Sequence, residues 1–486
     1  MVAINNSSRV LFVSPEVARV PENMGPHAVY AQIKTGGLAE FSAALIGDLW
    51  RVGIDLHLVM PWPGPGSPPP IRSTNHIHFT KGAKGGKEWI TKTCYTRSSE
   101  SIFQFQKEVI QDVLPRIKPD IVHCNDYMTG LIVAEAMRQN IPTLFTMHSV
   151  HSMKVPEHVS LALGWNNFIL NQHATIKHGH ISGKLRNLLA LAILSATHVN
   201  TVSPTFLKEL MSYKHLVSQE VLECLKIKEE VGQLSAILNT PDFSFNPAHD
   251  PSLVCNYDSS THPMGKKENK LFLQKALGLK PDAEAPLFYW PSRLDSQQKG
   301  CDLFIDILPE LTKNFRGKRP EIVVIADGDA QGHLKKMALG LQNCLAVLDF
   351  DEDLSRLSYG ASDFILMPSK YEPCGYPQLI GPIYGSIPIA HDTGGLHDTI
   401  DPLLTLKNSG CGFPFKVFSR SDFLSAVESA LAFYCISDEV KRLQIQRIMD
   451  QALERQLKFS LGRRYLSLYQ QVLEKDASLT GCTYEL

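Results

Sequence analysis

The sequence predicts an α/β protein with two doubly wound, Rossmann-like domains that face one another across a cleft. Short apolar runs, typical of strands buried on both faces of a parallel sheet, alternate with amphipathic helical stretches. The alternation occurs in two series, separated by a polar, proline-containing connection near residues 240–270. The length of 486 residues suits two large domains or about three ordinary ones. We expect domains at 1–250 and 265–455, with a C-terminal helix at 456–486 joining the first.

The first series begins with a buried strand and a helix opened by Gly36 and Gly37. The helix is expected to end at Gly53, and its apolar residues recur every three or four positions, which places them on one face. These residues are Leu38, Phe41, Leu45, Leu49 and Val52. The strands expected in this series lie at 10–13, 56–60, 120–123, 143–147 and 198–202. A strand, a helix and a second strand in this order form a crossover unit that is nearly always right-handed.

The second series repeats the pattern with an amphipathic helix at 303–311. Its expected strands lie at 287–290, 322–326, 345–348, 364–367 and 387–390. Two irregular stretches interrupt the first series. Residues 61–70 contain six prolines and predict an extended loop, and residues 15–33 form a long connection after the first strand.

Composition excludes several classes of protein. Hydrophobic residues make up 44% and charged residues 20%, as in ordinary globular chains rather than disordered ones. With 48 basic and 49 acidic side chains, the sequence lacks the excess of positive charge that is typical of proteins that bind nucleic acid or an anionic membrane. Ten cysteines without a C-x-x-C pair indicate reduced thiols. The start lacks a basic segment, and the longest apolar stretch, 188–194, is too short for a membrane span. We expect a soluble, cytoplasmic protein.

Two glycine pairs follow predicted strands at helix starts. Lys34 precedes Gly36 and Gly37 in the first series, and Thr393 precedes Gly394 and Gly395 in the second. Glycine lets a phosphate approach the backbone closely, and free amides at a helix start favour its negative charge. A glycine pair alone more often marks a plain turn before a helix, and Lys34 in the same turn shifts the balance toward a phosphate site. The segment 81–87 is also rich in glycine and lysine, but it lacks the spacing of a P-loop and predicts a solvated loop.

Two loops of the second series carry further candidates. Arg293 and Lys299 follow one strand and could neutralise a diphosphate whose charge grows as a bond to it breaks. Glu372 follows another, in a turn with Cys374 and Gly375. Its carboxylate could accept hydrogen bonds from sugar hydroxyls or only cap the next helix, and Cys374 could be a packing residue.

In the first series, Asp126 and Tyr127 end one strand and His148 ends the next. Asp126 could accept hydrogen bonds from sugar hydroxyls, and His148 could contact a reacting centre. His148, His151 and His158 do not have the i, i+4 spacing of a helical metal site, so no metal is expected.

The motifs together resemble the bacterial glycogen synthase and plant starch synthase family of retaining glycosyltransferases. The resemblance extends over roughly residues 8–470, and its densest part is MPSKYEPCGYPQL at 367–379. The other matching segments are KTGGLAE at 34–40, DYMTG at 126–130, TMH at 146–148, TVSPT at 201–205, ILN at 237–239, SRL at 292–294 and TGGLHDT at 393–399. Members have the GT-B fold and transfer glucose from ADP-glucose, or sometimes UDP-glucose, to an α-1,4-glucan end.

The resemblance implies a role for each candidate residue. Lys34, Gly36 and Gly37 would hold the donor from the first, acceptor-side domain. In the donor-side domain, Arg293 and Lys299 would neutralise the leaving diphosphate, and Glu372, Cys374 and Gly375 would contact the donor sugar. Thr393, Gly394 and Gly395 would complete the phosphate pocket, while Asp126, Tyr127, His148 and Asn239 would line the sugar side. Nucleotide-sugar and α-glucan are the expected partners, and no further cofactor is needed.

The sequence also departs from the family pattern. Arg293 and Lys299 are six residues apart rather than five, and the segment after His148 lacks the usual asparagine, tyrosine and glycine. Pro382 is expected to shorten or kink the helix that begins near Pro377. Most departures concern the sugar and acceptor side. A transferase with a smaller acceptor, or a non-catalytic glucan-binding homologue, therefore remains an alternative, and donor base and oligomeric state stay open.

Overall fold

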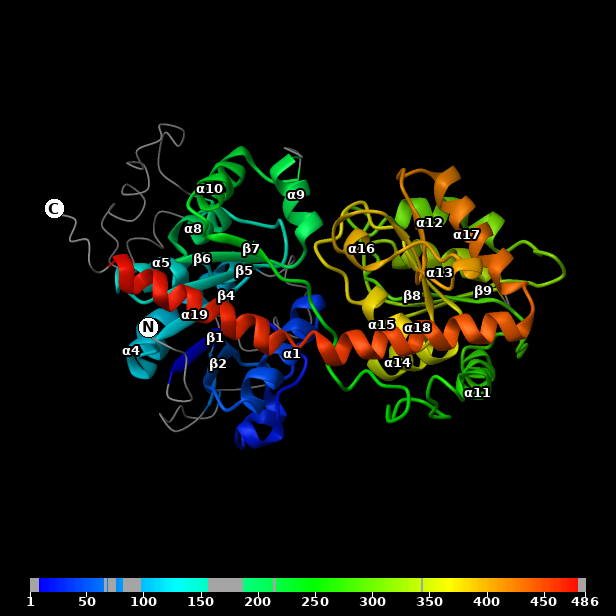
Figure 1. The fold of residues 1–486 in the computed structure, drawn as a ribbon, viewed down its shortest axis with the longest axis horizontal. Helices are drawn as coiled ribbons and strands as arrows, with labels where there is room; N and C mark the ends of the chain where they lie inside the picture. Colours follow the sequence, from blue (N-terminus) through cyan, green and yellow to red (C-terminus); the bar gives the residue numbers. More distant parts are fainter. Residues whose placement is uncertain are drawn as a thin grey trace. The chain divides into compact units, whose positions relative to one another are not determined.

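The structure is a computed structural model that describes residues 8–64, 68, 76–81, 98–155, 187–212, 216–341 and 344–479 (Figure 1). The chain divides into two compact units. Unit 1 comprises Met1–Asn239 and Ser460–Leu486, and unit 2 comprises Thr240–Phe459. Each unit is built around one parallel sheet, as the sequence predicts. Of the predicted solvated loop at 81–87, residues 82–87 lie outside the described residues, as does His158.

Unit 1 contains a seven-stranded sheet in the order β3-β2-β1-β4-β5-β6-β7. Its strands are β1 Arg9–Val13, β2 Asp55–Pro61, β3 Ile77–Thr80, β4 Ile121–Asn125, β5 Thr143–Met147, β6 His198–Thr201 and β7 Leu234–Ala236. All neighbouring strands pair in parallel. Strands β2 and β3 lie on one side of β1, and strands β4 to β7 follow in order on its other side. A crevice at the carboxyl ends of β1 and β4 is therefore the expected binding edge of this sheet.

The first helix of unit 1, α1 (Gly37–Arg51), begins at the predicted glycine pair. Leu38, Phe41, Leu45 and Leu49 are buried, as their spacing predicts. Val52 was assigned to the same face, but it follows the helix and is exposed. The other helices of this unit are η1 Glu22–Met24, η2 Ala28–Tyr30, α3 Ser99–Glu108, η3 Val109–Val113, α4 Leu114–Ile117, η4 Tyr127–Thr129, α5 Gly130–Arg138, α8 Leu188–Ser195, α9 Pro204–Ser212, α10 Gln219–Glu230 and α19 Leu461–Leu479.

The last helix, α19, is part of unit 1 although it follows unit 2 in the sequence. It packs against α1 and β5. The buried Tyr469 hydroxyl lies 2.7 Å from Nδ1 of His123, and Asn200 donates to the hydroxyl of Tyr465 over 2.9 Å. At the start of the helix, Asp48 Oδ2 accepts hydrogen bonds from the Ser460 hydroxyl and the Gly462 amide. Hydrogen bonds, in addition to apolar packing, therefore hold this helix to the rest of unit 1.

Unit 2 contains a six-stranded parallel sheet in the order β10-β9-β8-β11-β12-β13. Its strands are β8 Leu287–Trp290, β9 Glu321–Ile325, β10 Leu345–Leu348, β11 Phe364–Met367, β12 Ile387–His391 and β13 Phe413–Phe415. Its helices are α11 His262–Ala276, α12 Cys301–Leu311, α13 Gln331–Gly340, α14 Glu352–Ala361, α15 Pro377–Ile383, α16 Gly394–Thr399, η6 Thr405–Lys407, α17 Arg420–Tyr434 and α18 Asp438–Lys458. Here the strand order reverses between β8 and β11, which again marks the expected binding edge.

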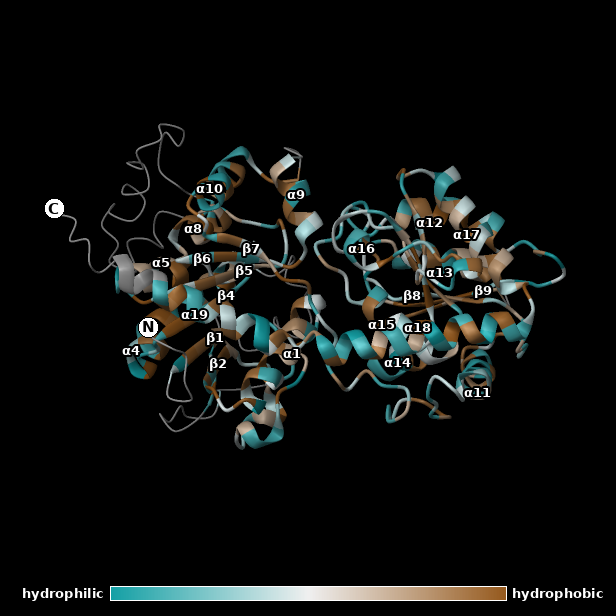
Figure 2. Cartoon of the chain, in the orientation of Figure 1, coloured by the Kyte–Doolittle hydropathy of each residue, from teal (hydrophilic) through white to brown (hydrophobic). Residues whose placement is uncertain are grey.

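The strands lie in apolar layers inside each unit, whereas the outer faces of the helices are polar (Figure 2). The apolar stretch at 188–194 forms the buried helix α8. The sequence interpretation missed β3, β7 and β13, which are edge strands of only three or four residues. Pro61 ends β2 rather than belonging to a loop. Helix α15 is only seven residues long and ends just after Pro382, as expected for a proline in its last turn.

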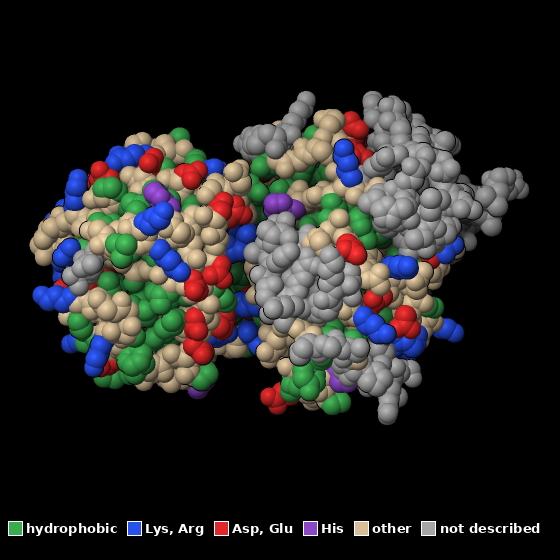
Figure 3. All heavy atoms as spheres, turned by 180° about the vertical axis from the view of Figure 1, so that it is seen from behind, with side chains coloured by type: hydrophobic (Ala, Val, Ile, Leu, Met, Phe, Trp, Pro, Cys, Tyr) green, Lys and Arg blue, Asp and Glu red, His purple; other side chains and the backbone are tan. Residues whose placement is uncertain are grey.

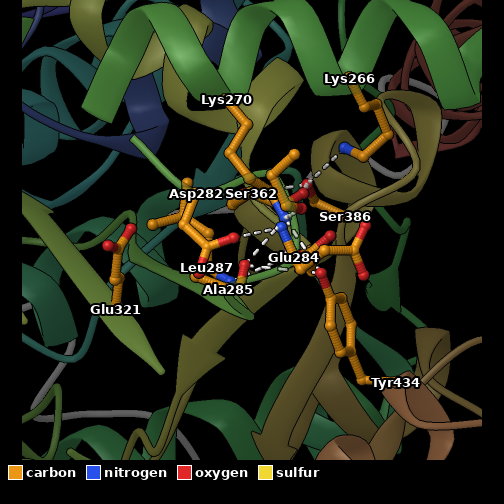
Figure 4. A network of polar contacts seen from close by, with 12 residues as sticks. Lys266, Lys270, Asp282, Glu284, Ala285, Leu287, Glu321, Ser362, Ser386 and Tyr434 are labelled. Carbon is orange, nitrogen blue, oxygen red and sulfur yellow. Dashed lines mark hydrogen bonds and ion pairs between the residues drawn. The ribbon is translucent and has the colours of Figure 1, made fainter. Parts of the chain in front are cut away.

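A buried polar network supports the amino ends of β8 and β11 in unit 2. Figure 4 shows Lys270 and Lys266 extending from α11 toward these strand ends. The Lys270 ammonium lies 2.6 Å from Oδ2 of Asp363, which also accepts the Leu287 amide over 2.8 Å. Lys266 donates to the carbonyl of Tyr384 over 2.9 Å, and burial lowers its pKa to about 7. The network therefore fixes the two strands whose opposite ends carry the candidate site.

The helices and one face of the described structure bear on the expectations about membranes and charge. No described helix combines the length and the apolar character that crossing a bilayer requires. On the face seen in Figure 3, basic and acidic side chains are interspersed. The cysteines at described positions are all free, and five of them are buried.

Candidate active site

The predicted site residues of unit 1 follow three neighbouring strands. Lys34 and Gly36 follow β1, Asp126 follows β4 and His148 follows β5, and β1, β4 and β5 are adjacent in the sheet. Because the carboxyl ends of parallel strands meet at one edge, these residues share the edge where the strand order reverses. Tertiary structure thus brings together residues that lie more than a hundred positions apart in the sequence.

The Lys34 loop is held by two buried carboxylates. Lys34 Nζ lies 2.6 Å from Glu40 in the first turn of α1, and Arg19 contacts the other oxygen of Glu40 at 3.3 Å. The hydroxyl of Thr35 donates to Glu16, which follows β1. Gly36 is the residue before α1, so the free amides of the first helical turn come directly after this loop. The loop therefore presents a cation and a helix start at the reversal edge, the combination that favours an anion.

Asp126 occupies a strained and buried position. Its backbone has φ 63°, which is uncommon for a residue with a side chain and is often found at functional sites. Its Oδ1 accepts hydrogen bonds from the Tyr127 amide at 2.9 Å and the Ser149 hydroxyl at 3.0 Å. Burial nevertheless raises the pKa of Asp126 to about 7. A carboxyl group with such a pKa can accept a hydrogen bond from a ligand hydroxyl or donate one.

His148 is held as a neutral imidazole. Burial lowers its pKa to about 3, and its ring packs against Phe41 with centroids 4.5 Å apart. Its Nε2 lies 3.1 Å from Oδ1 of Asn125, while the Asn125 amide nitrogen donates to the Val13 carbonyl. Because the amide oxygen can only accept, the imidazole proton sits on Nε2 and the lone pair on Nδ1. His148 can therefore accept a hydrogen bond from a ligand hydroxyl.

Two further predicted residues of unit 1 are buried. Tyr127 begins η4 and is only 4% exposed, so it contributes mainly through packing and its amide. Asn239, the last residue of the first segment of unit 1, is also buried, and its Oδ1 has no hydrogen-bond partner among the described residues. Buried polar atoms are rarely left without a partner, and an exception can mark a ligand position.

In unit 2, the loops that follow β8 and β11 meet through an ion pair. Lys299 Nζ lies 2.6 Å from Oε2 of Glu372, which also accepts the Ser369 hydroxyl at 3.0 Å. The Glu372 side chain is 5% exposed and that of Lys299 is 14% exposed. Glu372 therefore does not cap α15, which was the alternative interpretation of this residue. A buried ion pair adds little net stability, so its position at the reversal edge makes Lys299 and Glu372 candidates for a functional role.

The extra residue between Arg293 and Lys299 is accommodated in the turn. The side chain of Asp295 accepts the Gln298 amide at 3.1 Å, and the carbonyl of Gln298 accepts the Lys370 amide at 2.8 Å. Lys299 consequently still reaches Glu372. The Arg293 guanidinium lies 3.4 Å from the Asp295 carboxylate, and the Arg293 side chain is 22% exposed. Arg293 is therefore not part of the ion pair between Lys299 and Glu372.

Glycines allow the loops of unit 2 to approach one another closely. A Cβ at Gly395 would lie 2.1 Å from the carbonyl oxygen of Cys374, so only glycine fits where α16 meets the Glu372 loop. The Gly395 amide donates to the Glu372 carbonyl over 3.0 Å. Gly375 has φ 77°, a conformation that favours glycine. The loop after β12, which carries Thr393 and Gly394, is thereby joined to the Glu372 loop at the same edge.

Sequence reasoning missed four residues that position these groups: Glu16, Glu40, Ser149 and Ser369. Each lies within four residues of the end of a strand or the start of a helix. Their positions next to the motifs were the available signal, but their partners could not be predicted from spacing. Only the pairing of the strands sets these distances.

Comparison with known proteins agrees with this arrangement. Two parallel, doubly wound units with candidate residues at the reversal edge of each define the GT-B class of glycosyltransferases. The catalytic domain of starch synthase IV from Arabidopsis thaliana, bound to ADP and acarbose, matches 97% of this chain and 99% of its own with a TM-score of 0.78 at 24% identity. An Anabaena protein in complex with UDP and glucose matches with a TM-score of 0.54 at 16% identity, covering 97% of this chain and all of its own.

Sequence comparison identifies the family. Residues 9–223 match the starch synthase catalytic domain, and residues 285–431 match glycosyl transferases group 1. Glycogen synthase of Clostridium acetobutylicum is 32% identical over 83% of this chain and 90% of its own. Glycogen synthase of Kosmotoga olearia is 30% identical over 97% of this chain and 99% of its own. The chain belongs to the glycogen synthase and starch synthase family, as its motifs predict, and is a hexosyltransferase.

Proposed function

We propose that this chain transfers glucose from ADP-glucose to the non-reducing end of an α-1,4-glucan with retention of the anomeric configuration. The observation that carries this proposal is the buried Lys299–Glu372 pair at the reversal edge of unit 2, next to the glycines of the β12 loop. A cation at 2.6 Å from a carboxylate is held in place before the substrate arrives. Preorganised charge of this kind stabilises a transition state without reorganisation during the reaction.

Each group has a role in one bond exchange. The bond between the glucose C1 and the diphosphate oxygen breaks as a bond from the acceptor hydroxyl to C1 forms on the same face. Lys299 and Arg293 offset the charge that develops on the leaving diphosphate, and the acceptor proton passes to it. Glu372, with the turn at Cys374 and Gly375, would orient the transferred sugar. No protein nucleophile is required for this exchange.

Unit 1 residues would bind the sugar side. Lys34, Gly36 and Gly37 would contact the donor, and Asp126 and Asn239 would bind hydroxyl groups. His148 is neutral, so it would act as a hydrogen-bond acceptor at Nδ1 rather than as a cation. The loss of Asn, Tyr and Gly after His148 concerns this side and supports a second candidate, a transferase that acts on a short or different acceptor.

A donor and acceptor matrix tests the proposal. Purified protein is assayed with ADP-glucose or UDP-glucose, each with glycogen, with a short maltooligosaccharide, or alone, and both nucleotide release and glucan extension are measured. Extension of glycogen with ADP-glucose is expected. A preference for UDP-glucose would refute the donor assignment, and extension of the short acceptor alone would favour the second candidate. Absence of all turnover, with glucan binding retained, would indicate a non-catalytic homologue.

Two variants separate catalysis from folding. Lys299→Ala is expected to lower kcat about 10²–10³-fold, the typical loss when one group that stabilises developing charge is removed. Lys335→Ala is a matched control in the same unit, because Lys335 pairs with Asp349 at the surface. Its kcat should be unchanged. Equal activity of the two variants, at equal melting temperature, would refute the role of Lys299.

A further inference from the structure

Unit 1 contains a second cluster of ionisable side chains, at the amino ends of its strands and so on the opposite side of the sheet from the candidate active site. Asp55 is the first residue of β2, His57 lies two positions further along the strand, and His76 directly precedes β3. Strands β2 and β3 are parallel, so their amino ends meet at one edge. Lys34, Asp126 and His148 lie at the carboxyl ends of their strands. The cluster therefore does not belong to the transferase site.

The three side chains converge closely enough to share one ion. Each offers one ligand atom, and these atoms all lie within 4.8 Å of one another. Oδ1 of Asp55 is 3.1 Å from Nε2 of His57 and 3.9 Å from Nδ1 of His76. Ligand atoms that each lie about 2.0–2.2 Å from a tetrahedral ion are themselves roughly 3–4 Å apart. Two imidazoles and a carboxylate thus already have nearly the spacing of a metal-binding set.

Asp55 and His57 are each also oriented by a contact through their other polar atom. Nδ1 of His57 lies 3.0 Å from Nε2 of the buried His78. Nδ1 of His76 lies 3.0 Å from the Leu56 carbonyl oxygen, and His76 gives up this hydrogen bond when the same nitrogen binds a metal, because a ligating nitrogen carries no proton. The other oxygen of Asp55 accepts a hydrogen bond from Arg9 over 2.8 Å. Histidine ligands typically donate their second ring nitrogen in this way, which fixes the tautomer and the ring orientation. When His57 donates from Nδ1 to His78, its Nε2 carries the lone pair that a metal requires.

We propose that Asp55, His57 and His76 form a binding site for a divalent transition metal, with Zn²⁺ as the representative ion. Imidazole nitrogens favour Zn²⁺, Cu²⁺, Ni²⁺ and Co²⁺, whereas Mg²⁺ and Ca²⁺ require oxygen ligands. The side chains of Asp55 and His76 are 23% and 33% exposed, so water can complete the coordination. Because β3 is an edge strand, the ion would fasten it to β2. The role is structural, and the proposal does not depend on the transferase function.

Metal binding by the full chain tests the site directly. Tag-free protein is stripped with a chelator, dialysed, and titrated with ZnCl₂ in a calorimeter, and its metal content is measured after gel filtration. One equivalent of Zn²⁺ and a higher melting temperature are expected, because a ligand that binds only the native state stabilises it. Titration with Co²⁺ should give the visible absorption of a four-coordinate ion. Protein without bound metal and without a shift in melting temperature would overturn the proposal.

Variants show whether these residues are the ligands. His76→Gln removes a partly exposed ligand and is expected to weaken Zn²⁺ binding at least tenfold while the metal-free melting temperature stays unchanged. His78→Gln removes only an orienting contact and is expected to weaken binding about 10–100-fold. His333→Gln, an exposed histidine in unit 2, is the matched control and should bind like the original chain. Equal affinity of the His76→Gln and His333→Gln variants would place any bound metal elsewhere and refute the site.

Discussion

The buried pair of Lys270 and Asp363 gives a sharp test of how unit 2 supports its site. Lys270→Met keeps the bulk of the side chain but removes its charge. The Lys270 side chain is 4% exposed and that of Asp363 is 17% exposed, so the carboxylate would lose its ion pair and keep only the Leu287 amide and the more distant charge of Lys266. Removing one partner of a buried pair typically costs about 3–5 kcal/mol, and the partial exposure of Asp363 places the expected loss near 3 kcal/mol.

Local hydrogen exchange is the suitable assay, because a chain with two units need not unfold in a single transition. The amides of β8 and β11 report on the affected strands, since Asp363 precedes β11 and accepts the Leu287 amide of β8. A loss of about 3 kcal/mol corresponds to roughly 10²-fold faster exchange when opening is at equilibrium. The amides of unit 1 should exchange as before.

Two further variants decide whether the charge is the cause. Lys335→Met breaks a surface pair with Asp349 and should cost only about 0–1 kcal/mol. Adding Asp363→Asn to Lys270→Met removes the carboxylate charge that has lost its partner. The double variant should recover about 1 kcal/mol or more of the free energy of unfolding, because the effects of substitutions at residues in contact are not additive. Exchange in Lys270→Met that matches Lys335→Met would refute the reasoning, and so would the absence of any recovery in the double variant.

Three other predictions concern unit 1. Tyr469→Phe leaves Nδ1 of His123 without its partner and should lower the free energy of unfolding by about 1–3 kcal/mol, measured by exchange of the α19 amides; an unchanged rate would contradict this role. Asp48→Ala removes the acceptor at the start of α19 and should cost about 0.5–2 kcal/mol, seen as faster exchange at the amide of Gly462. The pKa of Asp126 is about 7 in the native state, so the native state keeps a proton that the unfolded chain releases from about pH 4. The free energy of unfolding should therefore fall by up to about 4 kcal/mol from pH 4 to pH 7 relative to Asp126→Asn, and parallel pH profiles would refute the shift.

The sequence could predict much of the fold because parallel strands covered on both faces are continuous apolar runs. Strands β1, β8 and β11 were recognisable for this reason, and α1 was recognisable from its period of three and four. The edge strands β3, β7 and β13 were not, because polar residues or a proline interrupt their short segments (IHFT, LSA and FPF), so none of them is a continuous apolar run.

The candidate site could be predicted as a set of motifs but not as a set of contacts. Lys299 and Glu372 stand out because each lies in a loop after a strand, next to glycine or proline, and Lys34 stands out because it precedes the glycine pair at a helix start. That Lys299 binds Glu372 and Lys34 binds Glu40 follows from the loops that the sheets bring together. The turn accommodates the extra residue before Lys299, so that Lys299 still lies 2.6 Å from Glu372, a contact that the spacing alone did not predict.

The sequence by itself determined the two α/β units, the family and the candidate residues for its chemistry, because these depend on local periodicity and on motifs within short segments. Only the tertiary structure decided the partners and protonation of those residues, such as the neutral His148 and the raised pKa of Asp126. It also brought His76 next to Asp55 and His57. Burial and pairing between strands cause these effects, and both depend on residues that are distant along the chain.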